Sequence, residues 1–107
     1  MAYESWHVIS ELQNGWTGTI SYAKNGAGRI KIKGQITPGT KAWGTLITTM
    51  PAEYKPPVWM LINVFAVNGD VLQGIAINST DGSIKIYNPA TASDNTSTWV
   101  FYVEYDS

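Results

Sequence analysis

Alternation of apolar and polar residues is the main pattern along this chain. Residues 29–36, RIKIKGQI, carry isoleucine at positions 30, 32 and 36, with arginine, lysine or glutamine between them. Because successive side chains of a β-strand point to opposite faces, this pattern predicts a half-buried strand with a cationic outer face. Similar patterns predict further strands over residues 19–23, 43–49, 71–78, 83–87 and 99–105.

Residues 58–67, VWMLINVFAV, are apolar on both faces of a predicted strand. An antiparallel strand in a small domain usually keeps one face in water. Either loops of the same chain cover the second face, or another subunit packs against it. The preceding segment 50–57 contains three prolines. Proline fixes φ and cannot donate to a ladder, so this segment is predicted to be a rigid connection.

Asn-Gly and Asp-Gly pairs separate the apolar runs. They are Asn25-Gly26, Asn68-Gly69 and Asp81-Gly82, and such pairs tolerate the positive φ of type I′ hairpin turns. Residues 88–98 are rich in Ala, Ser, Thr and Asn, which predicts an exposed loop. No window favours an amphipathic helix. The chain is therefore predicted to be all-β, a single domain over residues 1–107, folded as a small antiparallel Greek-key β-barrel or sandwich of about seven to eight strands.

Composition excludes several classes of function. The 107 residues include no Cys, so there are no disulfides, thiol nucleophiles or thiolate zinc sites. Seven Lys plus Arg against eight Asp plus Glu give a net charge of −1, which argues against a nucleic-acid partner. The longest apolar run is too short for a membrane-spanning helix, and we expect no membrane partner.

Candidate catalytic groups are scarce. The single histidine, His7, has no nucleophile-elbow pattern or triad context around it. Among the carboxylates, Asp70 and Asp81 are explained by turns, and no pair is predicted to hydrolyse glycosides. We therefore expect a protein that is not an enzyme and that has no catalytic residue, metal or cofactor.

Aromatic residues are the remaining candidates for chemistry. Five Trp and six Tyr supply rings that can stack on the C–H face of a sugar. Trp16 and Trp43 lie next to glycines at predicted strand ends, and are candidates for ligand stacking or for core packing. Asp94 and Asn95, in the predicted loop, are candidates for polar ligand contacts, unless that loop is only a solvated connection.

Several short motifs resemble a known family. Residues 12–18, LQNGWTG, resemble the LLNGW opening common in tail proteins of phages that infect Gram-positive bacteria. The segments GQI at 34–36, MPAEYKP at 50–56 and INSTDGSI at 77–84 follow in that family's order. The resemblance covers about residues 12–105, with Gln13 and Met50 in place of the usual leucines.

The resemblance implies a receptor-binding head domain of a tail fibre or baseplate, located in the virion and acting at the host surface. Such heads are similar to small β-barrels that form homotrimers and bind host cell-wall saccharides without catalysis. The chain would then be the C-terminal head of a longer tail protein. The 58–67 strand fits a position along a three-fold axis. The alternatives are a monomeric carbohydrate-binding module and a structural tail trimerisation domain with no ligand.

The outward row Arg29, Lys31 and Lys33 also has two interpretations. In the family context, the row fits contacts with phosphate groups of a cell-wall polymer. In the second interpretation, lysines protect an edge strand from pairing with another chain.

Overall fold

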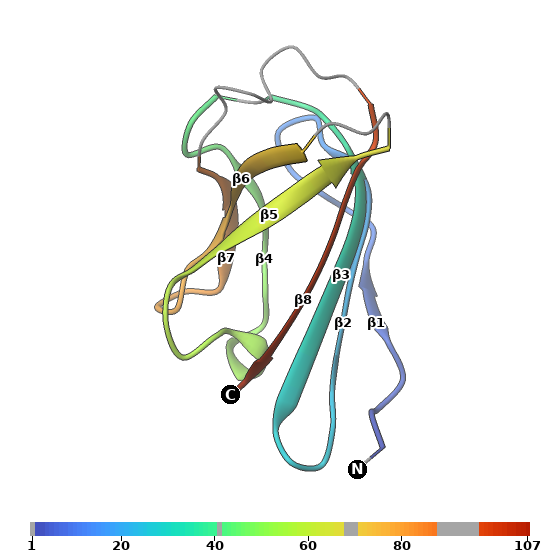
Figure 1. Ribbon diagram of the computed structural model, residues 1–107, viewed down its shortest axis with the longest axis vertical. Helices are drawn as coiled ribbons and strands as arrows, with labels where there is room; N and C mark the ends of the chain where they lie inside the picture. The colour runs from blue at the N-terminus through green and yellow to red at the C-terminus, as the bar shows by residue number, and fades with distance from the viewer. Residues whose placement is uncertain (1, 41, 68–70, 88–96) are drawn as a thin grey trace.

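The computed structural model of the protein describes residues 2–40, 42–67, 71–87 and 97–107. Its strands form one antiparallel sheet in the order β1-β2-β3-β8-β5-β6-β7-β4 (Figure 1). The elements in chain order are β1 (His7–Ile9), β2 (Thr17–Lys24), β3 (Arg29–Thr37), β4 (Leu46–Thr49), the 3₁₀ helix η1 (Ala52–Tyr54), β5 (Met60–Ala66), β6 (Val71–Ile77), β7 (Ser83–Ile86) and β8 (Trp99–Asp106). No helix among the described residues is long and apolar enough to cross a membrane.

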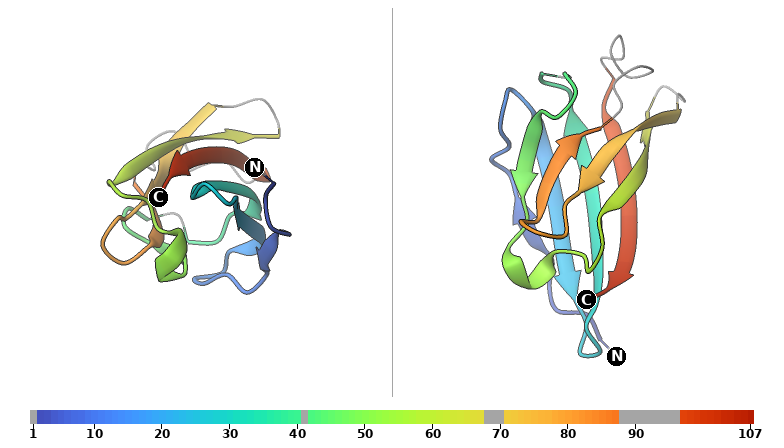
Figure 2. Two further views of the ribbon diagram at one scale, coloured as in Figure 1. Left: turned by 90° about the horizontal axis from the view of Figure 1, so that it is seen from below. Right: turned by 90° about the vertical axis from the view of Figure 1, so that its left-hand side faces the viewer.

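The sheet curls around its own inner face, which Figure 2 shows in end view. Strands β5, β6 and β7 are consecutive neighbours, and β8 returns to lie beside β5, which is Greek-key order. The two edge strands are β1 and β4. Next to β4, the Gln13 N–H donates to the Ile47 carbonyl at 2.8 Å and Asn14 Nδ2 donates to the Leu46 carbonyl at 2.8 Å. The prediction of an all-β antiparallel fold is confirmed.

The core fills the inner face of the curled sheet. Its fully buried isoleucines are Ile20, Ile30, Ile32, Ile36, Ile47, Ile75, Ile77, Ile84 and Ile86. Trp99 is also fully buried, and its ring meets that of Trp16 edge-on at 4.9 Å between centroids. Burying one such side chain contributes about 1.5–3 kcal/mol relative to leaving it in water. The regular alternation seen in the sequence is therefore the main source of stability.

Strand β5 buries only one of its two apolar faces. Ile62 and Val64 lie in the core, whereas Leu61 and Phe65 are each 50% exposed. The interpretation that loops of the same chain cover the second face is therefore wrong for these two residues. Strand β5 pairs with β8 only through its last two residues, where Phe65 is opposite Val100.

Two of the predicted type I′ turns form different loops. Between β2 and β3, neither Asn25 nor Gly26 has a positive φ, and the left-handed residue is Gly28, at φ 86°. The Gly28 N–H donates to the Asn25 carbonyl at 3.1 Å, as in a three-residue hairpin loop. Between β6 and β7, only Gly82 of the Asp81-Gly82 pair has a positive φ, 75°. The Asn68-Gly69 pair lies outside the described residues.

Candidate functional site

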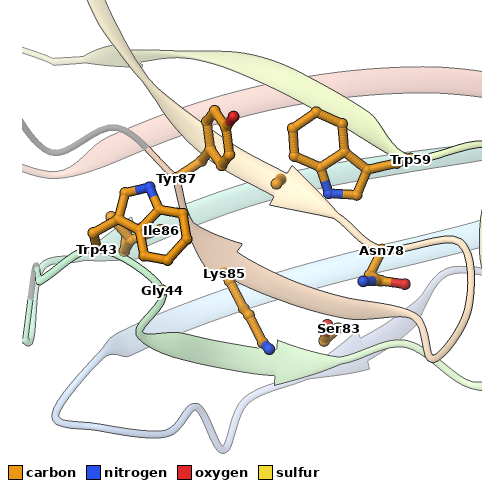
Figure 3. A pocket seen from close by; sticks show the side chains of 9 residues that line it. Trp43, Gly44, Trp59, Asn78, Ser83, Lys85, Ile86 and Tyr87 are labelled. Carbon is orange, nitrogen blue, oxygen red and sulfur yellow. The ribbon is translucent and has the colours of Figure 1, made fainter.

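A cleft of about 280 Å³ opens on the outer face of β6 and β7, beside the start of β4 (Figure 3). We call it the aromatic cleft. Its lining residues are Trp43, Gly44, Trp59, Ala76, Asn78, Ser83, Lys85, Ile86 and Tyr87. The aromatic members are unusually accessible, since Trp43 is 69%, Trp59 46% and Tyr87 37% exposed.

The three rings of the aromatic cleft contact one another through Tyr87. Its centroid lies 4.9 Å from that of Trp59, with the ring planes at 69°. The Trp43 centroid lies 6.0 Å away on the other side, with the planes at 46° (Figure 3). The Trp59–Tyr87 contact is edge-to-face, which is favourable because the positive edge of one ring meets the negative face of another, and the Trp43–Tyr87 contact is tilted. They restrain the two indoles while leaving much of their surface open.

A tight turn before β4 positions Trp43. Gly44 adopts φ 83°, a left-handed conformation that disfavours other residues, and its N–H donates to the Ile86 carbonyl at 2.7 Å. Thr45 Oγ1 closes the turn by donating to the Ala42 carbonyl at 2.7 Å. The turn is thus anchored to β7, and Trp43 projects from it beside the outer face of the sheet.

The period of the strands positions the other residues. Leu61, Ala76 and Lys85 are cross-strand partners on the outer faces of β5, β6 and β7. Trp59 precedes Leu61 by two residues and Tyr87 follows Lys85 by two, so both extend the same outer face. Ala76 is small and 6% exposed. A larger side chain at that position would occupy the cleft.

The polar wall of the aromatic cleft consists of Asn78, Ser83 and Lys85. Asn78 Oδ1 accepts from the Thr80 N–H at 2.7 Å, and no hydrogen bond within the described chain uses Nδ2. The Lys85 ammonium has no carboxylate within 4 Å in the described ranges. Both groups are therefore donors open to a ligand.

Ser83 is the buried member of this wall. Its N–H donates to Asp81 Oδ1 at 2.9 Å, which lowers the pKa of that carboxyl. The nearby Ser83 hydroxyl also lowers the pKa of the Asp81 carboxyl. The Ser83 Oγ is buried and has no hydrogen bond of good geometry. None of the residues lining the cleft is a carboxylate or a histidine. In the described part of the chain, no group of three or more His, Cys, Asp or Glu could hold a metal ion.

The sequence-predicted site residues lie in different places. Trp43 lines the aromatic cleft, as described above. Trp16 is only 2% exposed, and its Nε1 donates to the Thr40 carbonyl at 2.9 Å, so the expectation of an exposed stacking face there is wrong. Asp94 and Asn95 lie outside the described residues.

His7 belongs to a separate cluster at the edge of the sheet. Its Nε2 lies 2.9 Å from Glu4 Oε2, and its ring stacks on Tyr22 with 5.1 Å between centroids. The Tyr54 hydroxyl donates to the same Glu4 carboxylate. That hydrogen bond raises the pKa of Tyr54 to about 12 and lowers the pKa of Glu4. These contacts attach the N-terminal segment to η1.

The fold and the geometry of the site define a small all-β domain with an aromatic cleft on its outer face. Comparison with known proteins adds no closer class. No protein-family model matches the chain, and no curated protein matches it significantly.

Proposed function

We propose that this protein is a non-catalytic saccharide-binding domain and that the aromatic cleft is its ligand site. The observation that carries the proposal is the grouping of three partly exposed rings beside unused hydrogen-bond donors. Indole and phenol rings offer apolar surface for the C–H face of a sugar. The Asn78 amide and the Lys85 ammonium supply donors for its hydroxyls.

In the proposed complex, one pyranose ring stacks on Trp43, which has the most open indole of the aromatic cleft. Ala76 leaves the floor of the cleft free, and the polar wall fixes the orientation of the sugar. Trp59 lies beyond Tyr87 and provides a second apolar surface for the next sugar of a chain. Such a site binds weakly by itself, because polar groups of both partners lose water as they pair.

The biological setting that we propose is recognition of host cell-wall saccharides by a phage tail. The LQNGWTG segment and the motifs that follow it support this setting. The proposed assembly is a homotrimer, supported by the half-exposed apolar side chains of Leu61 and Phe65 on the outer face of β5, on either side of the exposed Asn63. Repetition of a weak site around a trimer raises avidity by about 10²–10⁴ without new contacts.

Two alternatives share parts of this proposal. A monomeric carbohydrate-binding module would use the same aromatic cleft and leave the β5 face in water. A structural tail domain would trimerise without a ligand, so substitutions in the cleft would change no interaction. The accessibility of Trp43 and Trp59 favours a binding function over the structural one.

Fluorescently labelled protein, incubated with a panel of Gram-positive cells and with their extracted wall polysaccharides, tests the proposal. We expect selective binding that free polysaccharide competes away. Trp43→Ala removes the stacking surface and Ala76→Leu fills the cleft, so both should abolish binding, whereas Trp43→Phe should retain part of it. Thr49→Ala, at an exposed position of β4, is the control. Undiminished binding by folded Trp43→Ala and Ala76→Leu would show that the cleft is not the site.

A further inference from the structure

Strand β8 is paired along its whole length on one side only. Its register with β3 extends from Trp99 to Asp106, whereas its register with β5 includes only Trp99 and Val100. Figure 1 shows β5 and β8 meeting at that point and running apart below it. Among the described strands, none pairs with the second side of residues 101–106 of β8.

The hydrogen bonds identify the backbone groups that this edge leaves free. The Ser107 N–H donates to the Gly28 carbonyl at 3.0 Å, one step beyond the end of the β3–β8 register. Hydrogen-bonded pairs alternate along an antiparallel ladder, so the odd-numbered residues of β8 bond to β3 and the even-numbered ones face the other way. On that other side, the Thr98 carbonyl accepts from the Val67 N–H at 2.9 Å. In the described part of the chain, no backbone hydrogen bond reaches the groups that follow on this side, which belong to Tyr102, Glu104 and Asp106.

The other edges of the sheet are short or covered. Strand β1 has 3 residues, and the free side of β4 accepts from the Gln13 N–H and from Asn14 Nδ2. Lysines often protect an edge strand from unwanted pairing, but β3, which carries Lys31 and Lys33, lies between β2 and β8. The interpretation of that row as edge protection is therefore wrong. The open part of β8, residues 101–106, contains neither lysine nor proline.

Apolar side chains lie on both sides of the open edge. On the inner side, Val103 of β8 and Met60 of β5 pack against the core, but both are only partly buried. An added strand with an apolar residue on that side would bury them further, since alternate residues of a strand share a face. On the outer side, a groove of about 320 Å³ begins where the two strands run apart, and its lining residues are Asn63, Phe65, Val100, Phe101 and Tyr102.

The outer side of the edge is acidic. Glu104 and Asp106 share one cation, since Arg29 Nε lies 3.7 Å from Glu104 Oε1 and Arg29 Nη1 lies 3.3 Å from Asp106 Oδ1. Within the described ranges, no other cation lies within 4 Å of either carboxylate. Two antiparallel copies of this edge, centred on Glu104, would place the two Glu104 side chains opposite each other, and like charges in that position are destabilising. The edge therefore favours a basic strand over a second copy of itself.

We propose that the open edge of β8 is a docking site for an extended basic segment of another protein, which adds a strand to the sheet. The backbone of the segment bonds to the free N–H and C=O groups of Tyr102, Glu104 and Asp106. A lysine or arginine of the segment lies opposite Glu104, and an apolar residue opposite Val103 extends the core. This inference does not depend on the saccharide proposed for the aromatic cleft. The bonded residues also differ from those of the proposed trimer contact on β5.

Hydrogen exchange of the free protein, followed by NMR for each amide, tests whether the edge is open. We expect fast exchange at the Tyr102 and Glu104 amides and slow exchange at Val103, whose amide bonds to β3. Slow exchange at all three would show that the edge is already covered and would overturn the proposal. Protection of Tyr102 and Glu104 that increases with protein concentration would do the same, because the occupant would then be a second copy.

The probe for binding is the synthetic peptide acetyl-KVKVT-amide. When it runs antiparallel to β8, its lysines lie opposite Asp106 and Glu104, and its second valine lies opposite Val103. Titration into the ¹⁵N-labelled full chain should shift the Tyr102 and Glu104 amides and slow their exchange. N-methylation of the central lysine should abolish binding, because that N–H points at β8. N-methylation of the second valine is the matched control, because its N–H points away, and binding should persist.

Two results with these peptides would contradict strand addition: no binding of the unmodified peptide, or an equal loss of binding with both methylated forms.

Charge variants test the basic character of the partner. Glu104→Gln should weaken binding of the KVKVT peptide about twofold to threefold, as expected for one exposed ion pair. Glu11→Gln removes an exposed carboxylate before β2 and should leave binding unchanged. A peptide with glutamate in place of both lysines should bind more weakly than KVKVT. Equal affinity of the two peptides, or of Glu104→Gln and the wild type, would show that the edge does not select a basic segment.

Discussion

The ring of Phe101 occupies the space that a side chain at Gly34 would need. The two residues are cross-strand partners in β8 and β3, and a Cβ built on Gly34 would lie 2.2 Å from Phe101 Cε1. Phe101 is 5% exposed, so its ring has little room to move away. The absence of a side chain at Gly34 therefore allows an aromatic ring to cover the middle of the sheet.

Gly34→Ala should destabilise the fold by about 1–3 kcal/mol through overpacking against this ring. The measurement is the midpoint of chemical denaturation. Replacing Phe101 by leucine in the same chain should remove part of the clash. The loss in the Gly34→Ala/Phe101→Leu double variant should therefore be smaller than the sum of the two single losses. Strict additivity would contradict the proposed contact.

Trp16 and Trp43 should respond to alanine substitution in opposite ways. Trp16→Ala should cost about 3–5 kcal/mol of stability, because it empties a buried site against Trp99. Trp43→Ala should change stability by less than about 0.5 kcal/mol, since its side chain is largely exposed. Thermal unfolding measures the loss of stability in Trp16→Ala. Binding to cell-wall polysaccharide measures the functional effect of Trp43→Ala. A purely structural domain would show no binding effect with Trp43→Ala.

Stability should fall at alkaline pH because of Tyr54. Its hydrogen bond to Glu4 raises the tyrosine pKa from 10.0 to about 12, so the folded state holds the proton more tightly than the unfolded state. The stabilisation of the fold by this hydrogen bond is complete below pH 10 and is lost as the pH rises through about 12. Tyr54→Phe should be less stable than wild type at pH 8, and the difference should narrow at pH 11.

Burial raises the pKa of Tyr105 in the same direction, so the wild-type protein loses stability from both groups. Tyr105→Phe therefore serves as the comparison for Tyr54→Phe. The lowered pKa of Glu4 affects stability at acidic pH instead. The stabilisation from the Glu4 carboxylate is present above the ordinary carboxyl pKa and is lost on acidification. An unchanged difference between wild type and Tyr54→Phe from pH 8 to 11 would argue against the Glu4–Tyr54 contact.

The proposed homotrimer predicts that charge on the outer face of β5 causes dissociation. Leu61→Lys/Phe65→Lys places two ammonium groups at positions that are each 50% exposed, so the fold of each subunit should survive. Sedimentation velocity should show a trimer for the wild type and a monomer for this double variant. Thr49→Lys, on β4, should remain trimeric. A monomeric wild type would support the carbohydrate-binding module instead.

The alternating pattern predicted the strands well. Residues 29–36 and 99–105 form β3 and β8, each extended by one residue at its C-terminal end. In β3 the alternating Arg, Lys and Gln residues identify the buried face. The turns were less predictable. Asn25-Gly26 and Asp81-Gly82 permit type I′ turns, but the chain places its positive φ only at the later glycine of each loop.

The same period also bears on the candidate site residues. Trp16 is an even number of residues from Ile20 and so shares its buried face. The neighbouring Gly15 instead suggested the end of a strand, where a ring could be exposed. Trp59 was harder to place, because both faces of its strand are apolar. Asn63 was the one polar residue there, and it does mark the exposed face. The grouping of Trp43 and Trp59 around Tyr87 depends on the β5–β6 and β6–β7 pairings and could not be predicted from local sequence.

The position of β8 has a consequence for how the chain folds. Strands β1–β3 form one half of the sheet and β5, β6, β7 and β4 the other, and within the sheet β8 is the strand between them. Both halves can form hairpins from neighbouring segments, but the sheet becomes continuous only after the last strand has been synthesised and has inserted. Contacts so distant in sequence slow folding. Until β8 arrives, β3 and β5 each expose an unpaired edge, so this interval is when the nascent chain is most prone to aggregate.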